Sequence, residues 1–279
     1  MKIAIVTCEQ LPQLTEEDQT LARALMAKGH QVEACIWSAP RSWRQYDLLI
    51  IRSVWDYHRR VDEFLTWINT VKELNLLNDP QVVLWNYQKS YLKELTEAGF
   101  HTIPTLWFEA NQQPHLEELL RQQQWSSAIM KPVVGATAYQ TLKLELADLQ
   151  DFDWNQRSYP FGFMVQKYME EISTQGEWSH VFFNKVYSHS VLKTAKSGDF
   201  RVQGDFGGQK ELLTPPMAYV HQCQRVLDHL PCSLLYARVD GLHLNGQFHI
   251  MEVELIEPEL FLWNDSITRN MVNAIETLV

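Results

Sequence analysis

Residues 236–255, YARVDGLHLNGQFHIMEVEL, contain charged side chains within two otherwise apolar segments. The segments have the composition of strands, and the Asn245-Gly246 pair between them is typical of a tight hairpin turn. Glu252 and Glu254 are two residues apart, so they lie on one face of their strand. Two negative charges on one face are unfavourable unless a cation lies between them. The hairpin therefore indicates a cation site, with a solvent-facing acidic strand paired with Lys or Arg as the alternative.

The geometry of the hairpin decides whether Asp240 joins these glutamates. A regular two-residue turn pairs Asp240 with Met251 and places its side chain on the opposite face. A three-residue connection with a bulge, with its glycine in the left-handed region, instead pairs Asp240 with Glu252. The same register pairs Arg238 with Glu254. A metal site made by the three carboxylates therefore requires an odd-length connection or a bulge.

The N-terminal part of the chain alternates between strand and helix patterns. Residues 2–7 are continuously apolar, as in a strand buried on both faces of a parallel sheet. A helical pattern follows between a Thr15 cap and Gly29. Two further strands and a helix are expected at 31–37, 47–52 and 61–74. This βαβ pattern predicts an open parallel sheet with ligands at the carboxyl ends of its strands, although no GxGxxG dinucleotide motif is present.

Antiparallel strands are expected to dominate the rest of the chain. Helical patterns occur at 89–98, near 115–124 and near 218–229. Strand patterns occur at 127–131, 141–145, 162–168, 178–187, 189–196, 234–243 and 247–255. We therefore predict a mixed α/β and α+β protein, divided into an N-terminal domain (1–88), a central lobe (89–168) and a C-terminal lobe with the metal site (169–279).

Composition excludes several classes of protein. The net charge of -10, without a clustered basic surface, argues against a nucleic-acid binder. No stretch approaches the roughly 18 to 20 apolar residues of a membrane span. The cysteines form no CxxC pair, and the first residues lack a signal-peptide pattern. We expect a protein of the reducing cytoplasm that binds neither nucleic acid nor membrane.

Two segments have the residue types that a nucleotide requires. Lys131 ends a strand before a loop of small residues with Gly135, where backbone amides and a lysine charge suit phosphates. Taken alone, an ordinary glycine-containing hairpin is the commoner explanation. Residues 164–169 end another strand and could read an adenine edge, and the Glu177 carboxylate could accept hydrogen bonds from ribose hydroxyls. An edge strand with a solvated acidic turn is the alternative.

Two further segments are candidates for substrate recognition. Residues 52–57, Arg-Ser-Val-Trp-Asp-Tyr, begin at the carboxyl end of a predicted parallel strand, where a substrate loop would lie. Residues 199–208 combine Arg201 with glycines, which suits carboxylate or phosphoryl oxygens, whereas a plain flexible loop is the alternative. The sequence contains no GxSxG nucleophile motif.

Taken in order, these motifs resemble the ATP-grasp superfamily. The resemblance rests on Lys89, Met130-Lys131-Pro132, Val165-Gln166-Lys167-Tyr168, Arg201 with Gly207-Gly208, Arg238-Val239-Asp240 and Glu252-Val253-Glu254. Within the superfamily, the branch that closes D-cycloserine from O-ureido-D-serine is most similar at 52–57, Trp85-Asn86, 201–203 and 254–258. The resemblance implies a βαβ domain followed by a two-lobed ATP-grasp fold.

The resemblance also implies a role for each matching residue. Phosphate contacts fall on Lys89, Lys131 and Gly135, adenine contacts on Gln166, Lys167, Tyr168 and Met169, and the ribose contact on Glu177. Two Mg²⁺ ions would bind to Asp240, Glu252 and Glu254, although many relatives have Asn in place of Glu254. Arg238, Lys131 and Arg201 would stabilise developing charge in catalysis. Substrate recognition would fall on Arg52, Ser53, Trp55, Asp56, Tyr57, Gln203, Gly207 and Gly208.

The implied activity is an ATP-dependent ligation of a carboxylate and an amine. ATP would convert a small amino-acid-like carboxylate into an acyl phosphate, which an amine attacks, within the same molecule if the product is cyclic. A small-molecule kinase of the same fold and a non-catalytic ATP-binding regulatory protein are the alternatives. The sequence leaves the two substrates open. A homodimer is the default expectation for a soluble protein.

Overall fold

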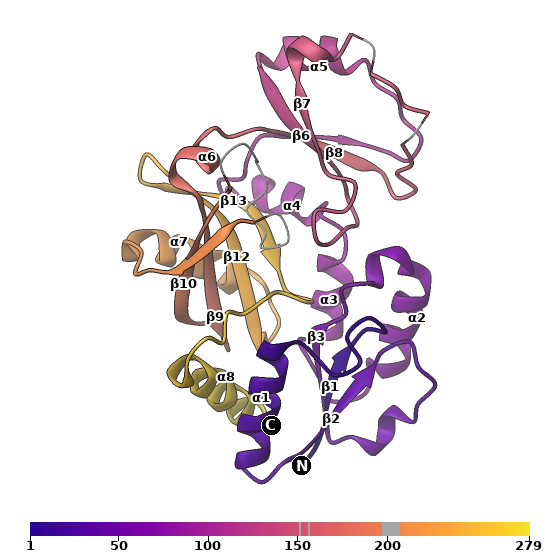
Figure 1. The fold of residues 1–279 in the computed structure, drawn as a ribbon, viewed down its shortest axis with the longest axis vertical. Coiled ribbons are helices and arrows are strands. Elements are labelled where there is room, and N and C mark those ends of the chain that lie inside the picture. Colours follow the sequence, from indigo (N-terminus) through magenta and orange to yellow (C-terminus); the bar gives the residue numbers. More distant parts are fainter. Residues whose placement is uncertain (151, 156, 197–206) are drawn as a thin grey trace. The chain divides into compact units, whose positions relative to one another are not determined.

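The structure is a computed structural model, and it describes residues 1–150, 152–155, 157–196 and 207–279 (Figure 1). The described residues form two compact units. The first unit comprises Met1–Tyr87, Trp178–Leu192 and Glu211–Val279, and the second comprises Gln88–Glu177 and Lys193–Lys210. The predicted combination of a parallel sheet with antiparallel sheets is confirmed. The three-domain division of the sequence stays a prediction.

The first unit begins with the predicted parallel sheet. Its strands, in the spatial order β2-β1-β3-β4, are Gln31–Ile36, Lys2–Thr7, Leu48–Ser53 and Leu76–Leu77. All three neighbouring pairs in this sheet are parallel. The accompanying helices are α1 (Glu16–Ala27), α2 (Val61–Val71) and α3 (Pro80–Asn86), with short 3₁₀ helices η1 (Trp43–Gln45) and η2 (Tyr57–Arg59). The apolar run that predicted β1 is buried, as expected for a strand covered on both faces.

Local sequence fixes both ends of α1. The Thr15 side chain accepts a hydrogen bond from the Asp18 backbone N–H at 3.1 Å, and Gly29 adopts a φ of +88° just beyond the helix. Both features match the predicted cap and stop. Leu21 and Leu25 are completely buried, so the apolar stripe of the helix faces the core of the first unit.

The C-terminal helix α8 (Asp265–Leu278) was not predicted, and it packs beside α1 (Figure 1). Asn264 caps it by accepting from the Ile267 backbone N–H at 3.0 Å. Ile267, Met271 and Ile275 recur at four-residue spacing and are buried in the same core as α1. This spacing is the signal that could have revealed the helix.

A five-stranded sheet completes the main framework. Its spatial order is β11-β10-β9-β12-β13, with bounds Gln209–Leu212, Val186–Thr194, Glu177–Phe183, Tyr236–Leu244 and Gln247–Glu254, and helix α7 spans Met217–His229. The prediction of one strand over 178–187 is wrong. Asn184 and Lys185 have φ of 48° and 58°, so the chain turns there and Val186 begins a new strand.

The second unit contains an antiparallel sheet with its own core. The sheet order is β5-β8-β6-β7, with bounds Thr105–Phe108, Phe163–Lys167, Ser127–Pro132 and Leu142–Glu145. The helices are α4 (Tyr91–Glu97), α5 (Leu116–Gln123) and α6 (Glu171–Gln175), with a 3₁₀ helix η3 at Leu146–Asp148. Phe163 is fully buried among Leu120, Met130 and other apolar side chains, and its ring stacks on Phe108 with centroids 4.9 Å apart. Among the described residues, no helix has the length and apolar character needed to cross a membrane.

Candidate active site

The hairpin of β12 and β13 has the register that the metal hypothesis requires. Asp240 lies opposite Glu252, and Arg238 lies opposite Glu254, as predicted. Leu244 pairs with Gln247, so the turn itself contains two residues, and of the two predicted alternatives the bulge occurs and the odd-length connection does not. The required bulge is instead next to Asp240, where the register shifts by one residue. This position brings Asp240 to the face of the glutamates at the site itself, as bulges commonly do beside functional residues.

Gly241 is the residue that permits this bulge. A Cβ atom at Gly241 would lie 2.1 Å from the backbone oxygen of His249 and 2.9 Å from the Phe248 ring. No side chain fits at these distances, so the two strands can approach closely only with glycine here. The turn glycine is different, because a Cβ at Gly246 would meet no atom within 4 Å, although its φ is +79°.

Arg238 is held by every arm of its buried guanidinium. Nε donates to Asp240 Oδ1 at 3.0 Å and Nη2 donates to Asp240 Oδ2 at 2.9 Å. Nη2 also pairs with the Glu254 carboxylate, and Nη1 donates to the Glu259 backbone oxygen at 3.0 Å. The Phe261 ring lies 5.6 Å from the guanidinium carbon. Arg238 is therefore rigidly oriented on the face that carries the acidic residues.

The carboxylates keep this arginine charged in its buried position. Burial by itself lowers the pKa of Arg238, but Asp240 and Glu254 overcome that effect and raise the pKa above its ordinary value. Asp240 also accepts a hydrogen bond from Ser179 Oγ at 2.7 Å. The site thus presents a fixed positive charge with a planar fork of donors.

The donor chemistry of Asp240, Glu252 and Glu254 fits magnesium, which prefers carboxylate oxygens. As the side chains lie, Asp240 and Glu254 hold Arg238, and the described ranges contain no group of three or more His, Cys, Asp or Glu side chains arranged around one metal position. A divalent cation bound by these oxygens would therefore share two carboxylates with Arg238.

The segment 257–263, which links β13 to α8, is fixed through its backbone. Glu17 accepts from the backbone N–H groups of Leu260 at 2.8 Å and Leu262 at 3.1 Å. The Leu260 oxygen lies 2.9 Å from Nε2 of His189, a buried side chain on β10. These bonds hold the segment at the position where its Glu259 oxygen receives Arg238.

His189 makes the stability of this arrangement depend on pH. Burial lowers the pKa of His189 from 6.5 to about 4, and the hydrogen bond to Leu260 opposes this only in part. The unfolded chain therefore takes up a proton at higher pH than the folded chain does. Stability is full above about pH 6.5 and falls as the pH drops towards 4, by up to about 1.4 kcal/mol per pH unit. Urea unfolding at a series of pH values between about 7.5 and 4.5 measures this dependence. The free energy of unfolding should fall less steeply with decreasing pH for His189→Gln than for the unchanged chain.

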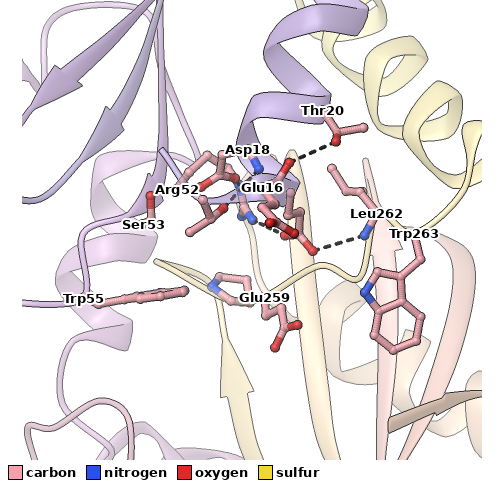
Figure 2. A pocket seen from close by; sticks show the side chains of 12 residues that line it. Glu16, Asp18, Thr20, Arg52, Ser53, Trp55, Glu259, Leu262 and Trp263 are labelled. Carbon is pink, nitrogen blue, oxygen red and sulfur yellow. Dashed lines mark hydrogen bonds and ion pairs between the residues drawn. The ribbon is translucent and has the colours of Figure 1, made fainter. Parts of the chain in front are cut away.

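A pocket of about 400 Å³ lies around Arg52 in the first unit (Figure 2). Arg52 is buried, with Nε donating to Asp18 at 2.8 Å and Nη2 donating to Glu17 at 2.8 Å. Its Nη1 is buried and has no hydrogen-bond partner with suitable geometry among the described residues. The lining also includes Glu16, Ser53, Trp55, Glu259 and Trp263, among others. The pocket therefore combines a paired arginine with acidic and aromatic side chains.

The predicted substrate loop only partly faces this pocket. Ser53 and Trp55 line it, and Trp55 Nε1 donates to the Glu257 backbone oxygen at 3.0 Å. Asp56 instead accepts from Trp37 Nε1 at 2.7 Å, and Tyr57 packs on Phe64 with ring centroids 4.9 Å apart. The sequence reasoning missed the acidic residues of the first turn of α1, although their position beyond the carboxyl end of β1 was a usable signal.

The predicted phosphate residues lie together in the second unit. Lys89 Nζ donates to the Gly135 backbone oxygen at 2.9 Å, and its backbone N–H donates to Val133 at 2.8 Å. Lys131 lies on β6 opposite Met164 of β8. A Cβ at Gly135 would approach Pro132 Cγ to 3.1 Å, so the loop has little room for a larger residue. Lys89, which precedes the strand and the loop in sequence, therefore contacts the loop that contains Gly135.

The predicted adenine and ribose residues follow β8. Gln166 is buried and donates to Thr105 Oγ1 at 3.2 Å, whereas Lys167, Tyr168 and Met169 mark the point where the strand ends. Glu177 is buried and forms an ion pair with Lys193, which the sequence reasoning did not identify. Arg201 and Gln203 lie outside the described residues, which resume at Gly207 and Gly208.

Comparison with known proteins gives consistent matches. Residues 3–78 match the family described as the N-terminal domain of D-cycloserine synthetase DcsG. The cycloserine biosynthesis protein DcsG of Streptomyces lavendulae is 26% identical, with 87% of this chain and 86% of that protein covered. The crystal structure of D-cycloserine synthetase DcsG matches with a TM-score of 0.85 at 23% identity and covers 100% of both chains. A D-alanine–D-alanine ligase from Bacillus anthracis matches with a TM-score of 0.67 at 14% identity, covering 100% of this chain and 98% of that one.

Proposed function

We propose that this chain is an ATP-grasp ligase that uses ATP and Mg²⁺ to join an amine to the carboxylate of a small amino-acid-like substrate. The resemblance noted in the sequence is thereby confirmed at the level of the superfamily and of its D-cycloserine branch. The observation that carries the proposal is the buried Arg238, fixed beside Asp240 and Glu254 by the bulge at Gly241.

The reaction has two steps. In the first, a substrate carboxylate oxygen attacks the γ-phosphorus of ATP, the bond to the β-phosphate oxygen breaks, and ADP leaves. In the second, the amine attacks the carbonyl carbon, inorganic phosphate leaves with its bonding pair, and the nitrogen loses a proton. The tetrahedral intermediate between attack and departure carries a negative oxygen. The positive charge of Arg238 stabilises this oxygen, and because its pairing holds the guanidinium in place, little reorganisation is needed.

The nucleotide part of the proposal rests on residues of the second unit. Lys89 and Lys131, with the Gly135 loop, would hold the phosphates, and the carboxylate of Glu177 would accept from the ribose. Residues 166–169 would contact the adenine. Solved ATP-grasp proteins of the same fold include complexes with ATP and with Mg and ADP. Arg201 would act in catalysis together with Arg238. Gln203, Gly207 and Gly208 would contact the substrate.

The metal part of the proposal concerns residues of the first unit. Asp240, Glu252 and Glu254 would hold two Mg²⁺ ions, and magnesium would supply positive charge to offset the developing charge on the phosphoryl oxygens. Arg238 then keeps Asp240 and Glu254 oriented when no cation is bound, because it already pairs with both carboxylates.

The substrate part of the proposal rests on the Arg52 pocket. Arg52 pairs with Glu17 and Asp18, and all three side chains line the pocket, so together they would face the charged groups of an amino-acid-like substrate. Ser53, Trp55, Asp56 and Tyr57 would support this recognition, the first two directly and the last two by holding the loop.

Arg52→Lys tests this assignment. Lysine keeps a positive charge between Glu17 and Asp18 but loses the planar guanidinium that pairs with both. The acidic side chains that line the pocket would then be less firmly oriented, so the KM of the amino-acid substrate should rise about tenfold or more, with kcat almost unchanged. Steady-state kinetics measure both constants. Unchanged values of KM and kcat would assign Arg52 a purely structural role.

The function itself is tested by a screen of amino acids and ureido amino acids for ATP-dependent phosphate release. Hydroxylamine, which traps acyl phosphates as hydroxamates, is added in parallel. Phosphate release with hydroxamate formation supports the ligase. ADP formation without hydroxamate indicates a kinase, and no ATP turnover with any carboxylate indicates a binding protein. A cyclic product without added amine would place the reaction within one molecule, as the name of the DcsG relative suggests for that protein. A homodimer and a cytoplasmic location stay predictions.

A further inference from the structure

Asn86 forms an unusual pair of contacts with the strand that carries Glu254. It is the last residue of α3 and is buried. Its Nδ2 donates to the Val253 backbone oxygen at 2.8 Å, and its Oδ1 accepts from the Leu255 backbone N–H at 2.9 Å. The two bonds therefore hold the backbone on both sides of Glu254.

The position of Glu254 in the sheet explains why such a clamp matters. Glu254 is the final residue of β13, and β13 is the last strand in the order of its sheet. Outward-facing backbone groups at the end of an edge strand have no strand ladder to hold them. The Asn86 amide takes the place of a neighbouring strand over one residue, because it offers one donor and one acceptor with the right spacing.

We propose that Asn86 is a positioning residue for the Glu254 carboxylate as a metal ligand, acting through the backbone on either side of it. The inference rests on the proposed function of Glu254. Asn86 itself touches neither the nucleotide residues nor the carboxylates in the described contacts; its two side-chain bonds go to the backbone. Groups that orient a metal ligand typically change metal affinity about 10- to 100-fold when they are removed.

The same hairpin supplies a matched control. Gln222 of α7 bonds to the backbone of β13 in the same manner, with Nε2 donating to the Gly246 oxygen at 2.9 Å and Oε1 accepting from the Phe248 N–H at 2.8 Å. These contacts flank Gln247, at the opposite end of the strand from Glu254. Gln222→Ala therefore removes an equivalent clamp without touching the proposed ligand.

The test measures Mn²⁺ binding to the full chain in the presence of a non-hydrolysable ATP analogue. The electron paramagnetic resonance signal of free Mn²⁺ gives the amount that is not bound. Asn86→Ala should weaken Mn²⁺ binding about tenfold, whereas Gln222→Ala should leave it unchanged. Asn86→Asp retains the acceptor for Leu255 and loses the donor to Val253, so a smaller loss is expected. This isosteric variant carries the test if Asn86→Ala does not fold.

The Glu254→Gln variant distinguishes the role of Glu254 as a metal ligand from the role of Asn86 in positioning it. If Glu254→Gln weakens Mn²⁺ binding but neither Asn86 variant does, the positioning inference is overturned while the metal assignment stands. If Glu254→Gln has no effect, the metal assignment fails. When Asn86 acts through Glu254, the combined variant should bind Mn²⁺ no more weakly than Glu254→Gln alone. If the losses of Mn²⁺ affinity caused by the Asn86 and Glu254 substitutions are fully additive, Asn86 does not act through Glu254.

Discussion

Replacing Arg238 with methionine is expected to reduce formation of the ligated product about 10²- to 10³-fold, the typical effect of removing one group that stabilises an oxyanion. The guanidinium is the side chain that combines burial, a fixed orientation and a raised pKa on the acidic face of the hairpin. Methionine fills a similar volume and removes every donor. The rate of product formation, measured with saturating ATP and both substrates, reports the loss, whereas trapped hydroxamate reports the first step alone.

The same variant should also be less stable. Removal of Arg238 leaves Asp240 and Glu254 buried or half-buried without their guanidinium, which costs about 3–5 kcal/mol for a broken buried pair. If the carboxylates are metal ligands, Mg²⁺ should raise the melting temperature of Arg238→Met more than that of the unchanged chain. Arg238→Lys keeps a charge but loses the planar fork, so it should recover stability better than activity. Full activity in Arg238→Lys would contradict a role that depends on the fixed orientation of the guanidinium.

Gly241→Ala is expected to have the second largest effect, on stability and metal binding together. The added methyl group would meet the His249 oxygen at 2.1 Å, so the strands must separate or the bulge must be lost. The cost should be about 3 kcal/mol, at the upper end for overpacking. Loss of the bulge would restore the regular register and turn Asp240 away from Glu252. Thermal unfolding and Mn²⁺ binding measure the two consequences.

Gly246→Asn is the control for that substitution. Gly246 also lies in this hairpin and has a φ of +79°, but no atom lies within 4 Å of a Cβ placed there. Asparagine tolerates the left-handed conformation better than other residues with side chains. This variant should therefore lose less stability than Gly241→Ala and retain the Mn²⁺ affinity of the unchanged chain. Equal losses of Mn²⁺ affinity in both variants would show that the bulge has no special part in the site.

Local patterns were sufficient for most of the fold. The apolar run at residues 2–7, the Thr15 cap and the Gly29 stop gave the first strand and helix with bounds close to those observed. These features depend on neighbours within a few residues, so the sequence reveals them. Asn184 and Lys185 were misread because neither is glycine, yet both take the left-handed conformation that a tight turn requires.

The candidate site divides in the same way. The acidic residues of the hairpin and the lysines could be proposed from the sequence because each belongs to a short motif. Glu17 and Lys193 were missed, since each is joined to its partner, Arg52 or Glu177, only after distant segments meet. Asp56 belongs to the predicted loop, but the structure directs it to Trp37. No local pattern states which way a side chain in a loop will point.

The sequence by itself determined the alternation of strands and helices and the condition that Asp240 must share a face with Glu252 and Glu254. That condition followed from the two-residue period of a strand. Only the tertiary structure decided how it is met. The turn stays regular, and the extra residue sits beside Gly241, because the backbone of β13 approaches there too closely for any side chain. A distance between two strands is set by all their neighbours together, and a single strand cannot specify it.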